Sequence, residues 1–197
     1  MNPAVAIFLK APRLGKVMTR LAAEIGDRQA LRLYRLIAAR TLDAVRESGL
    51  DATIWYAPAD AGPELRYWLG DEWALRPQAS GDLGARLAAS TQAVEAGRGW
   101  IAIGGDCPAL NAAHIQEARA ALERGEIAIG PTQEGGYYLL GGRTPLPDLF
   151  TSMPRSSQQL LAEARARLER AGVRWHELPA LREVDTAADA RAEGLLT

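Results

Sequence analysis

The sequence has little cysteine, histidine or lysine, and it has no long hydrophobic run. Cys107 is the only cysteine, so an internal disulfide is excluded and a reducing compartment such as the cytoplasm is the simplest expectation. The two histidines, His114 and His176, are too few and too isolated for a zinc site. The 23 basic residues face 24 acidic ones without a basic run, which argues against a nucleic-acid surface.

The longest early apolar stretch covers residues 4–9 and is followed directly by Lys10. It is far too short for a membrane span or the core of a signal peptide, so we expect a buried strand and no membrane association. The 197 residues are 48% hydrophobic and 24% charged, which is typical of an ordinary globular protein. We find no linker or repeat and predict one domain over residues 1–197.

Apolar stretches rich in β-branched or aromatic residues alternate with longer segments of helical period. This alternation predicts an α/β fold with a mostly parallel sheet flanked by helices. The expected strands cover residues 4–9, 53–57, 73–76, 100–104, 127–129 and 137–140, with a late strand at 173–178 that pairs at an edge or lies outside the sheet. The expected helices cover residues 27–48, 83–96, 112–124, 157–171 and 187–196, and 143–154 is expected to be a loop.

In an open α/β sheet, ligands bind outside the carboxyl ends of the strands. The segment after the first expected strand carries Lys10, Arg13, Lys16 and Arg20, together with Gly15, which lets the backbone approach an anion. It is not a P-loop, and no Gly-x-Gly-x-x-Gly motif follows a strand. The pattern indicates a site for phosphate, with ordinary surface charge as an equal alternative.

Asp106 follows the fourth expected strand, after two glycines and before Cys107 and Pro108. A carboxylate at a stiff strand end suits a hard cation such as Mg²⁺ or Mn²⁺, which in turn bridges phosphate oxygens. An Asp that closes a turn or caps a helix is an equal alternative. Cys107 lacks an activating neighbour and is better explained as a buried side chain than as a nucleophile.

Two further segments carry acids. Glu134 precedes Gly135, Gly136 and Tyr137 at the start of a strand, where a sugar or acceptor could approach and Glu134 could act as a base, although a plain β-turn is equally plausible. Asp185 stands before the last expected helix, and its local setting favours a helix cap.

Six motifs occur in order over nearly the whole chain: FLKAPRLG at 8–15, TRL at 19–21, GDLGAR at 81–86, GDCP at 105–108, GGYYLLG at 135–141 and VDT at 184–186. With these motifs the chain resembles small GT-A-fold transferases of the nucleotide-diphospho-sugar transferase superfamily. These are the glycosyltransferases associated with radical-SAM and selenoprotein gene clusters (selenodomain-associated), also called arsenosugar-biosynthesis glycosyltransferases. More distantly, the chain is similar to guanylyltransferases of molybdenum-cofactor and phospholactate metabolism.

The resemblance implies roles for individual residues. It implies Asp106 and Asp185 as ligands of Mg²⁺ or Mn²⁺, with Asp106 and Glu134 as catalytic residues. It places the acceptor or sugar at Gly135, Gly136 and Tyr137. The residues that it assigns to the nucleotide are Lys10, Ala11, Pro12, Arg13, Gly15, Lys16 and Arg20 in the first loop, and Asp82, Gly84 and Arg86 near the base.

The chain departs from the family pattern where Met18 replaces a common Lys, Glu134 an Asp, and Arg155-Ser156-Ser157 a Trp-Ser-Thr run. Loss of a cation at Met18 weakens nucleotidyl transfer most, because that reaction depends on positive charge around the α-phosphate. The ordered motifs make glycosyl transfer from a nucleotide sugar to a small acceptor the leading hypothesis. The alternatives are nucleotidyl transfer to a phosphorylated or carboxylated acceptor, and a nucleotide-binding module without catalysis; base, sugar, acceptor and oligomeric state are left open.

Overall fold

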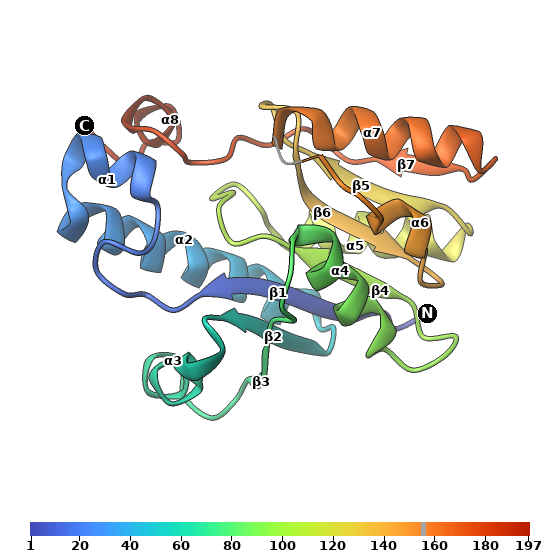
Figure 1. Ribbon diagram of the computed structural model, residues 1–197, viewed down its shortest axis with the longest axis horizontal. Coiled ribbons are helices and arrows are strands. Elements are labelled where there is room, and N and C mark those ends of the chain that lie inside the picture. Colours follow the sequence, from blue (N-terminus) through green and yellow to red (C-terminus); the bar gives the residue numbers. More distant parts are fainter. Residues whose placement is uncertain (155–156) are drawn as a thin grey trace.

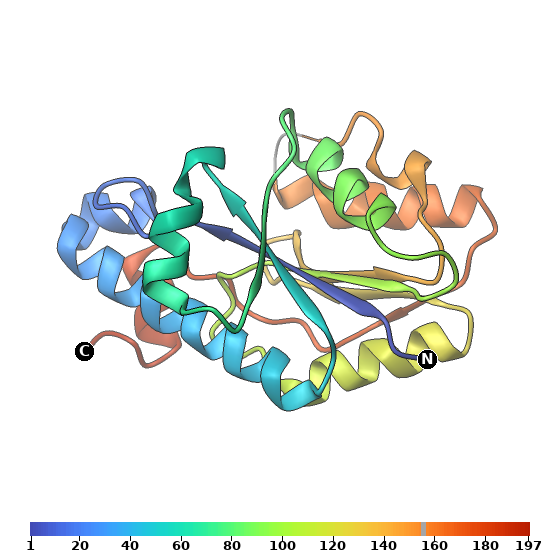
Figure 2. The same ribbon diagram turned by 90° about the horizontal axis from the view of Figure 1, so that it is seen from below.

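The structure, a computed structural model, describes residues 1–154 and 157–197. A single seven-stranded sheet runs through the molecule with helices on both faces (Figures 1 and 2). The strands are β1 (Ala4–Lys10), β2 (Ala52–Ala57), β3 (Ala74–Pro77), β4 (Trp100–Ile103), β5 (Ile127–Pro131), β6 (Tyr137–Gly142) and β7 (Trp175–Glu177). The helices are α1 (Thr19–Ile25), α2 (Asp27–Ser48), the 3-10 turn η1 (Ala59–Ala61), α3 (Gly62–Leu69), α4 (Leu83–Gln92), α5 (Ala112–Glu123), α6 (Pro147–Phe150), α7 (Ser157–Arg170) and α8 (Ala187–Ala192).

The strand order is β3-β2-β1-β4-β6-β5-β7. Strand β1 is parallel to β2 and β4, β2 is parallel to β3 and β5 to β7, whereas β6 is antiparallel to β4 and β5. This mixed but mostly parallel sheet confirms the α/β prediction. From β1 the chain first builds β2 and β3 on one side and then returns to place β4 on the other side. The carboxyl ends of β1 and β4 therefore form a topological switch point, where ligands bind in folds of this kind.

The sheet separates two apolar cores. Alternate side chains of a strand point to opposite faces, so Val5, Ile7 and Leu9 join the core beneath α2 and α5, whereas Phe8 packs into the core with α4, α6 and α7. Figure 2 shows these two sets of helices on opposite faces of the sheet. Because β1 and β4 are packed on both faces, the positions of their carboxyl ends are well fixed.

Most expected elements occur, with differences at their ends. The helix over residues 27–48 is confirmed, and the late strand is confirmed as an edge strand, β7 beside β5. Two helices end four residues earlier than expected, at Gln92 and Ala192; Gly194, with φ of 66°, ends α8, and Leu195 N donates to Ala190 O. Helices α1, α3 and α6 were not expected, and α6 lies within the segment expected to be a loop.

A helix needs about 20 mostly apolar residues to cross a bilayer. Within residues 1–154 and 157–197, no helix combines enough length with enough apolar character to do so.

Candidate functional site

The carboxyl ends of β1 and β4 bring Lys10 and Asp106 together. Ile7 and Ile103 are register partners in the parallel β1–β4 pair, and Lys10 and Asp106 each stand three residues beyond one of them. Gly105 allows the β4 loop to approach β1 closely, since a Cβ at this position would lie 2.5 Å from Leu9 Cδ2. Lys10 and Asp106 consequently line the same two cavities.

A backbone hydrogen bond brings Asp185 to the same place. Val184 N donates to Asp106 O at 3.0 Å, so the segment before α8 lies against the loop after β4. The expectation that Asp185 caps the last helix is wrong: Thr186 is the cap, and its Oγ1 accepts from Asp189 N at 3.2 Å. The Asp185 carboxylate is thereby left for Arg20, whose Nη1 donates to Oδ2 at 2.7 Å.

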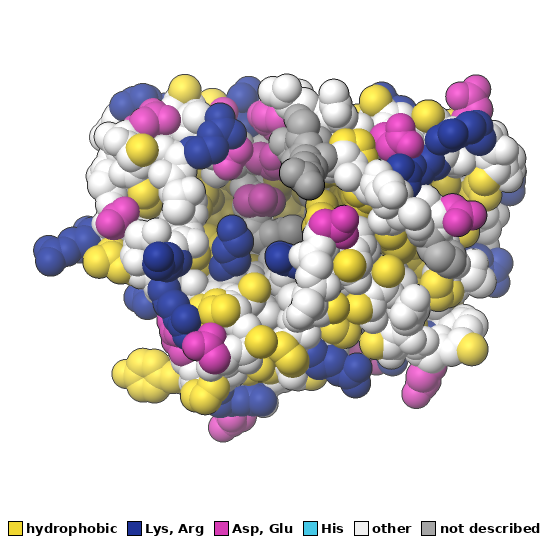
Figure 3. All heavy atoms as spheres, in the orientation of Figure 1, with side chains coloured by type: hydrophobic (Ala, Val, Ile, Leu, Met, Phe, Trp, Pro, Cys, Tyr) yellow, Lys and Arg dark blue, Asp and Glu magenta, His cyan; other side chains and the backbone are white. Residues whose placement is uncertain are grey.

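The two cavities adjoin. The larger has a volume of about 420 Å³, which is in the range of small-molecule sites, and the smaller has a volume of about 240 Å³. The apolar part of the larger wall is formed by Phe8, Leu83, Leu87, Tyr137, Leu140 and Leu160, and its charged part by Lys10, Arg86, Asp106, Glu183 and Asp185. The smaller cavity adds Lys16, Met18, Arg20 and Tyr34. Figure 3 shows acidic and basic side chains facing one another around a hollow in this side of the molecule.

Burial and neighbouring negative charge raise the pKa values of two carboxyl groups of the site, those of Asp106 and Glu183. Enclosure among protein atoms raises the pKa of Asp106, whose carboxylate still reaches solvent through the cavity, and negative charge from Asp185 and Glu134 adds to the rise. Lys10 acts in the opposite direction. Burial, followed by the charges of Asp106, Glu134 and Asp185, raises the pKa of Glu183 to about 8. Repulsion among these carboxylates would be relieved by a cation between them.

The donor set fits a divalent cation that is shared with a phosphate. Asp106 and Asp185 supply two carboxylates to the same cavities. Among the residues that the structure describes, no group of three or more His, Cys, Asp or Glu side chains forms a complete metal cage. Mg²⁺ is typically held by one or two carboxylates together with substrate phosphates, so these two acids suit Mg²⁺ or Mn²⁺.

Three cations of the site are not neutralised by acidic side chains. Within the described ranges, Lys10, Lys16 and Arg86 form no ion pair with Asp or Glu. The Arg86 guanidinium is instead oriented by Gln78 Oε1 at 3.3 Å and Gly81 O at 3.2 Å. All three side chains can therefore bind an anion without first breaking a salt bridge.

Part of the backbone of the first loop is hydrogen-bonded within the protein. Lys10 N donates to Tyr34 Oη, and Ala11 N to Ala57 O. Arg13 N donates to Ala11 O, and Lys16 N to Arg13 O. These four amides are therefore not available to a ligand, in contrast to the successive amides with which a P-loop cradles phosphates.

Several residues assigned to the nucleotide lie elsewhere. Arg13 pairs with Glu64 at 2.7 Å and Asp60 at 3.5 Å, on the side of α3 and η1. Asp82 caps α4 by accepting from Ala85 N at 2.9 Å. Gly84 packs under α6. Of the described residues that the resemblance assigned to the nucleotide, six line neither cavity: Ala11, Pro12, Arg13, Gly15, Asp82 and Gly84.

The segment expected on the acceptor side is divided. Gly136 and Tyr137 line the larger cavity. Gly135, with φ of 92°, lies beneath the start of α7, where a Cβ would come within 2.6 Å of Gln158 O. Glu134 lines neither cavity. Its Oε1 lies 4.0 Å from Arg182 Nη1, and its negative charge contributes to the raised pKa of Asp106.

The structure adds site residues that sequence reasoning did not single out. Glu183 lines the larger cavity, and its position beside Asp185 in an acidic run was the signal for it. Gln78 and Tyr34 line the cavities as well and carry no sequence signal of their own.

Cys107 is buried, and burial together with the charge of Asp106 raises the pKa of its thiol, which does not favour a nucleophile. Of the replacements noted in the sequence, Met18 lies in the wall of the smaller cavity, whereas Arg155 and Ser156 lie outside the described residues.

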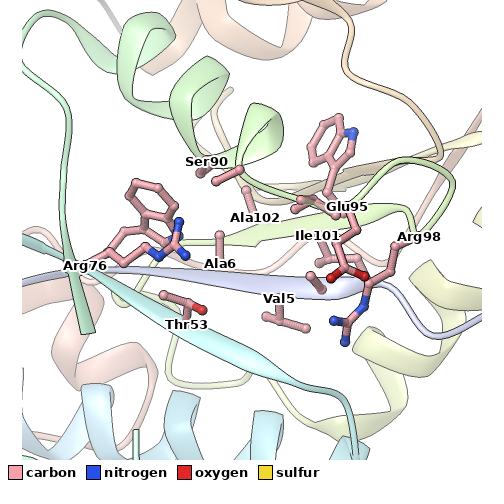
Figure 4. Close-up of a pocket in the computed structure, with 14 residues that line it drawn as sticks. Val5, Ala6, Thr53, Arg76, Ser90, Glu95, Arg98, Ile101 and Ala102 are labelled. Carbon is pink, nitrogen blue, oxygen red and sulfur yellow. The ribbon is translucent and has the colours of Figure 1, made fainter. Parts of the chain in front are cut away.

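A further cavity, of about 210 Å³, lies on the sheet face beneath α4, toward the amino-terminal ends of the strands. Figure 4 shows Arg76 at one end and Glu95 with Arg98 at the other, over a floor that includes Ala6 and Thr53. The guanidinium of Arg76 lies 5.9 Å from the centre of the Trp55 ring. Neither Asp106 nor Asp185 lines it, so this cavity lacks the two carboxylates that the other two cavities share.

Solved structures share this fold. A candidate nucleotide-diphospho-sugar transferase from Desulfovibrio desulfuricans G20 is 29% identical, with a TM-score of 0.90 over 98% of this chain and 86% of the other. A nucleotidyl transferase from Methanothermobacter thermautotrophicus (Mth528) is 16% identical, with a TM-score of 0.66 over 98% and 96%. The manganese complex of Rv0371c from Mycobacterium tuberculosis H37Rv is 20% identical, with a TM-score of 0.57 over 98% of each chain. The last two show the fold alone.

Sequence families give a further comparison. Residues 41–157 match the model of the family described as "Uncharacterized protein conserved in bacteria (DUF2064)", and the chain belongs to this family. No curated protein is similar enough to count as a match. The matched range contains Arg86 and Asp106 but neither the first loop nor Asp185, so the joining of these parts into one site rests on the structure.

Proposed function

We propose that this member of the DUF2064 family is a metal-dependent glycosyltransferase that moves a sugar from a nucleotide-sugar donor to a small acceptor. We place it with the radical-SAM- and selenodomain-associated GT-A transferases and treat residues 1–197 as one catalytic domain. One observation carries the proposal: unpaired cations and two carboxylates face one another across adjoining cavities at the carboxyl ends of β1 and β4. The likeness to a candidate nucleotide-diphospho-sugar transferase supports the same class.

The proposed roles follow from charge. Lys10 and Lys16 bind the diphosphate, and Arg86, held by Gln78, binds the nucleotide further along the larger cavity. Asp106 and Asp185 hold Mg²⁺ or Mn²⁺, and the manganese complex of the structural neighbour Rv0371c supports that choice. The metal, when bound, stabilises the negative charge of the departing nucleoside diphosphate.

The acceptor lies on the side of Gly136 and Tyr137. Here the wall is apolar, with Leu140 and Leu160 beside Tyr137, so it excludes water from the sugar and limits hydrolysis of the donor. Glu134 remains the proposed base. Because it lines neither cavity, this role requires the segment around it to shift when the acceptor binds.

Donor binding with and without metal tests the proposal. Nucleoside diphosphates with the common bases are titrated into the protein with Mn²⁺ or with a chelator. We expect binding that Mn²⁺ strengthens, and we expect Asp106→Asn to abolish that strengthening because it removes a metal ligand and keeps the side-chain shape. Asp60→Asn, on the exposed surface beside Arg13, is the control and leaves it intact. Metal-independent binding that Asp106→Asn does not alter would contradict the proposal.

Nucleotidyl transfer is the second candidate, favoured by the number of cations around the site: Lys10, Lys16, Arg20 and Arg86 could together meet the charge of a triphosphate. Release of pyrophosphate from a panel of nucleoside triphosphates would select it. The occupied amides of Lys10, Ala11, Arg13 and Lys16 argue against it, because those donors cannot stabilise charge that develops on the α-phosphate. A nucleotide-binding module without catalysis is the third candidate, and turnover of any donor excludes it.

A further inference from the structure

Arg20 occupies a carboxylate that the proposed metal would need. Its Nη1 lies 2.7 Å from Asp185 Oδ2, and the bond joins the start of α1 to the segment before α8. Both side chains are accessible to solvent, with 70% of Arg20 and 48% of Asp185 exposed. An ion pair of this kind contributes little to stability and can be exchanged at low cost.

The pair lies where two carboxylates repel each other. The negative charge of Asp185 is one of the causes that raise the pKa of Asp106. Arg20 offsets part of this repulsion by neutralising Asp185. A divalent cation on the same carboxylates would offset more of it, because it carries twice the charge, and it would compete with the guanidinium for Asp185 Oδ2.

Once released from Asp185, Arg20 is placed to bind a phosphate in the smaller cavity. It lines the smaller cavity together with Lys10 and Lys16, the two cations proposed to bind the diphosphate. A guanidinium binds phosphate oxygens in a bidentate manner, which neither lysine can do. The side chain is long and exposed, so it can turn from Asp185 to a phosphate without displacing any packed group.

We propose that Arg20 is an exchangeable counter-ion: it neutralises Asp185 until a divalent cation binds there, and it then passes to the phosphates of the ligand. Metal and phosphate binding are coupled through this exchange, since each one favours the position of Arg20 that the other requires. The inference rests on the proposed function, because it takes Asp185 as a metal ligand and a diphosphate as the group bound.

The first test measures the binding of Mn²⁺ alone. The electron paramagnetic resonance signal of free Mn²⁺ reports how much of the metal is unbound. Arg20→Gln removes the competitor, so we expect it to bind Mn²⁺ about twofold to fivefold more tightly than the wild type. Arg20→Lys keeps the charge and should stay close to the wild type. Arg40→Gln removes one positive charge from the exposed side of α2, lines neither cavity of the site, and should leave Mn²⁺ affinity unchanged.

Binding of inorganic pyrophosphate at saturating Mn²⁺ provides the second test. Here Arg20→Gln should bind about tenfold more weakly, because a charged, bidentate partner of the phosphates is lost. Opposite signs for the two ligands are the signature of the exchange, since a residue that only held the fold together would weaken both.

The outcomes separate this inference from the proposed function. If the wild type binds Mn²⁺ and pyrophosphate but Arg20→Gln binds Mn²⁺ no more tightly, the exchange is wrong and the transferase proposal stands. If Arg20→Gln weakens both ligands, the exchange is wrong as well. If the wild type binds no Mn²⁺, the metal-dependent function itself is wrong, and the exchange falls with it.

Discussion

Tyr34 and Lys10 exchange two hydrogen bonds across the base of the site. Tyr34 Oη donates to Lys10 O at 2.6 Å and accepts from Lys10 N at 2.8 Å. Tyr34 belongs to α2 and is buried, and burial raises the pKa of its hydroxyl, so the group stays protonated and keeps donating. A helix side chain thus fixes the last residue of β1, from which the Lys10 side chain extends into the cavities.

Tyr34→Phe should lower the free energy of unfolding by about 1–3 kcal/mol, since it leaves the backbone groups of Lys10 without their partner in a partly buried place. Chemical denaturation measures this change. We also expect weaker binding of nucleoside diphosphates, because Lys10 loses its fixed position. Tyr67→Phe is the matched control, since Tyr67 is 95% exposed and its loss of a hydroxyl should change neither quantity.

Gly84→Ala tests whether Gly84 serves packing, as the structure places it, or the nucleotide. Alanine normally favours a helix over glycine, but a Cβ here would lie 2.1 Å from Phe150 O. We expect thermal unfolding to reveal a loss of about 1–3 kcal/mol from this overlap. Ala85→Ser, an addition on the exposed side of the same helix, should stay within about 0.5 kcal/mol. Unchanged stability with lost nucleotide binding would favour the nucleotide role instead.

Arg86→Gln should weaken binding of nucleoside diphosphates about tenfold in calorimetric titrations with Mn²⁺, because an unpaired guanidinium in the larger cavity is lost. Arg76→Gln is the control from the cavity beneath α4 and should bind like the wild type. The reverse result, with Arg76→Gln impaired and Arg86→Gln unaffected, would move the nucleotide to the cavity of Figure 4.

Glu183→Gln should change the pH dependence of stability, measured by denaturation in the presence of a chelator. The pKa of Glu183 is about 8 in the folded protein and about 4.5 when unfolded, so between these values the folded state holds a proton that the unfolded state has lost. Stability of the wild type therefore falls as pH rises through this window. The variant escapes this loss and should gain on the order of 2 kcal/mol relative to the wild type by pH 8, and nothing below pH 4.5.

Loss of any negative charge could alter stability, so Glu47→Gln on the exposed side of α2 serves as the control for that general effect. A Glu183→Gln protein whose advantage over the wild type does not grow with pH would show that burial and the neighbouring acids do not raise the pKa of Glu183.

The residues around Asp106 show which parts of the candidate site could be predicted from the sequence. Strand ends are readable because buried strands and amphipathic helices leave local periodic patterns, and parallel neighbours place their carboxyl ends at one edge. That reasoning alone put Lys10 and Asp106 on the same side of the sheet. The partners of a side chain are not local: Arg13 stands in the same cationic loop as Lys10, yet it pairs with Glu64 and faces away from the cavities.

The sequence by itself determined the α/β class, the alternation of strands and helices, and the two strand ends that carry a cation and an acid, since each follows from patterns within a few residues. Only the tertiary structure decided that β4 returns beside β1, that Val184 bonds to Asp106, and that Asp185 meets Arg20 instead of capping α8. These depend on the path of the whole chain, because contacts between distant segments are selected by the packing of the complete core.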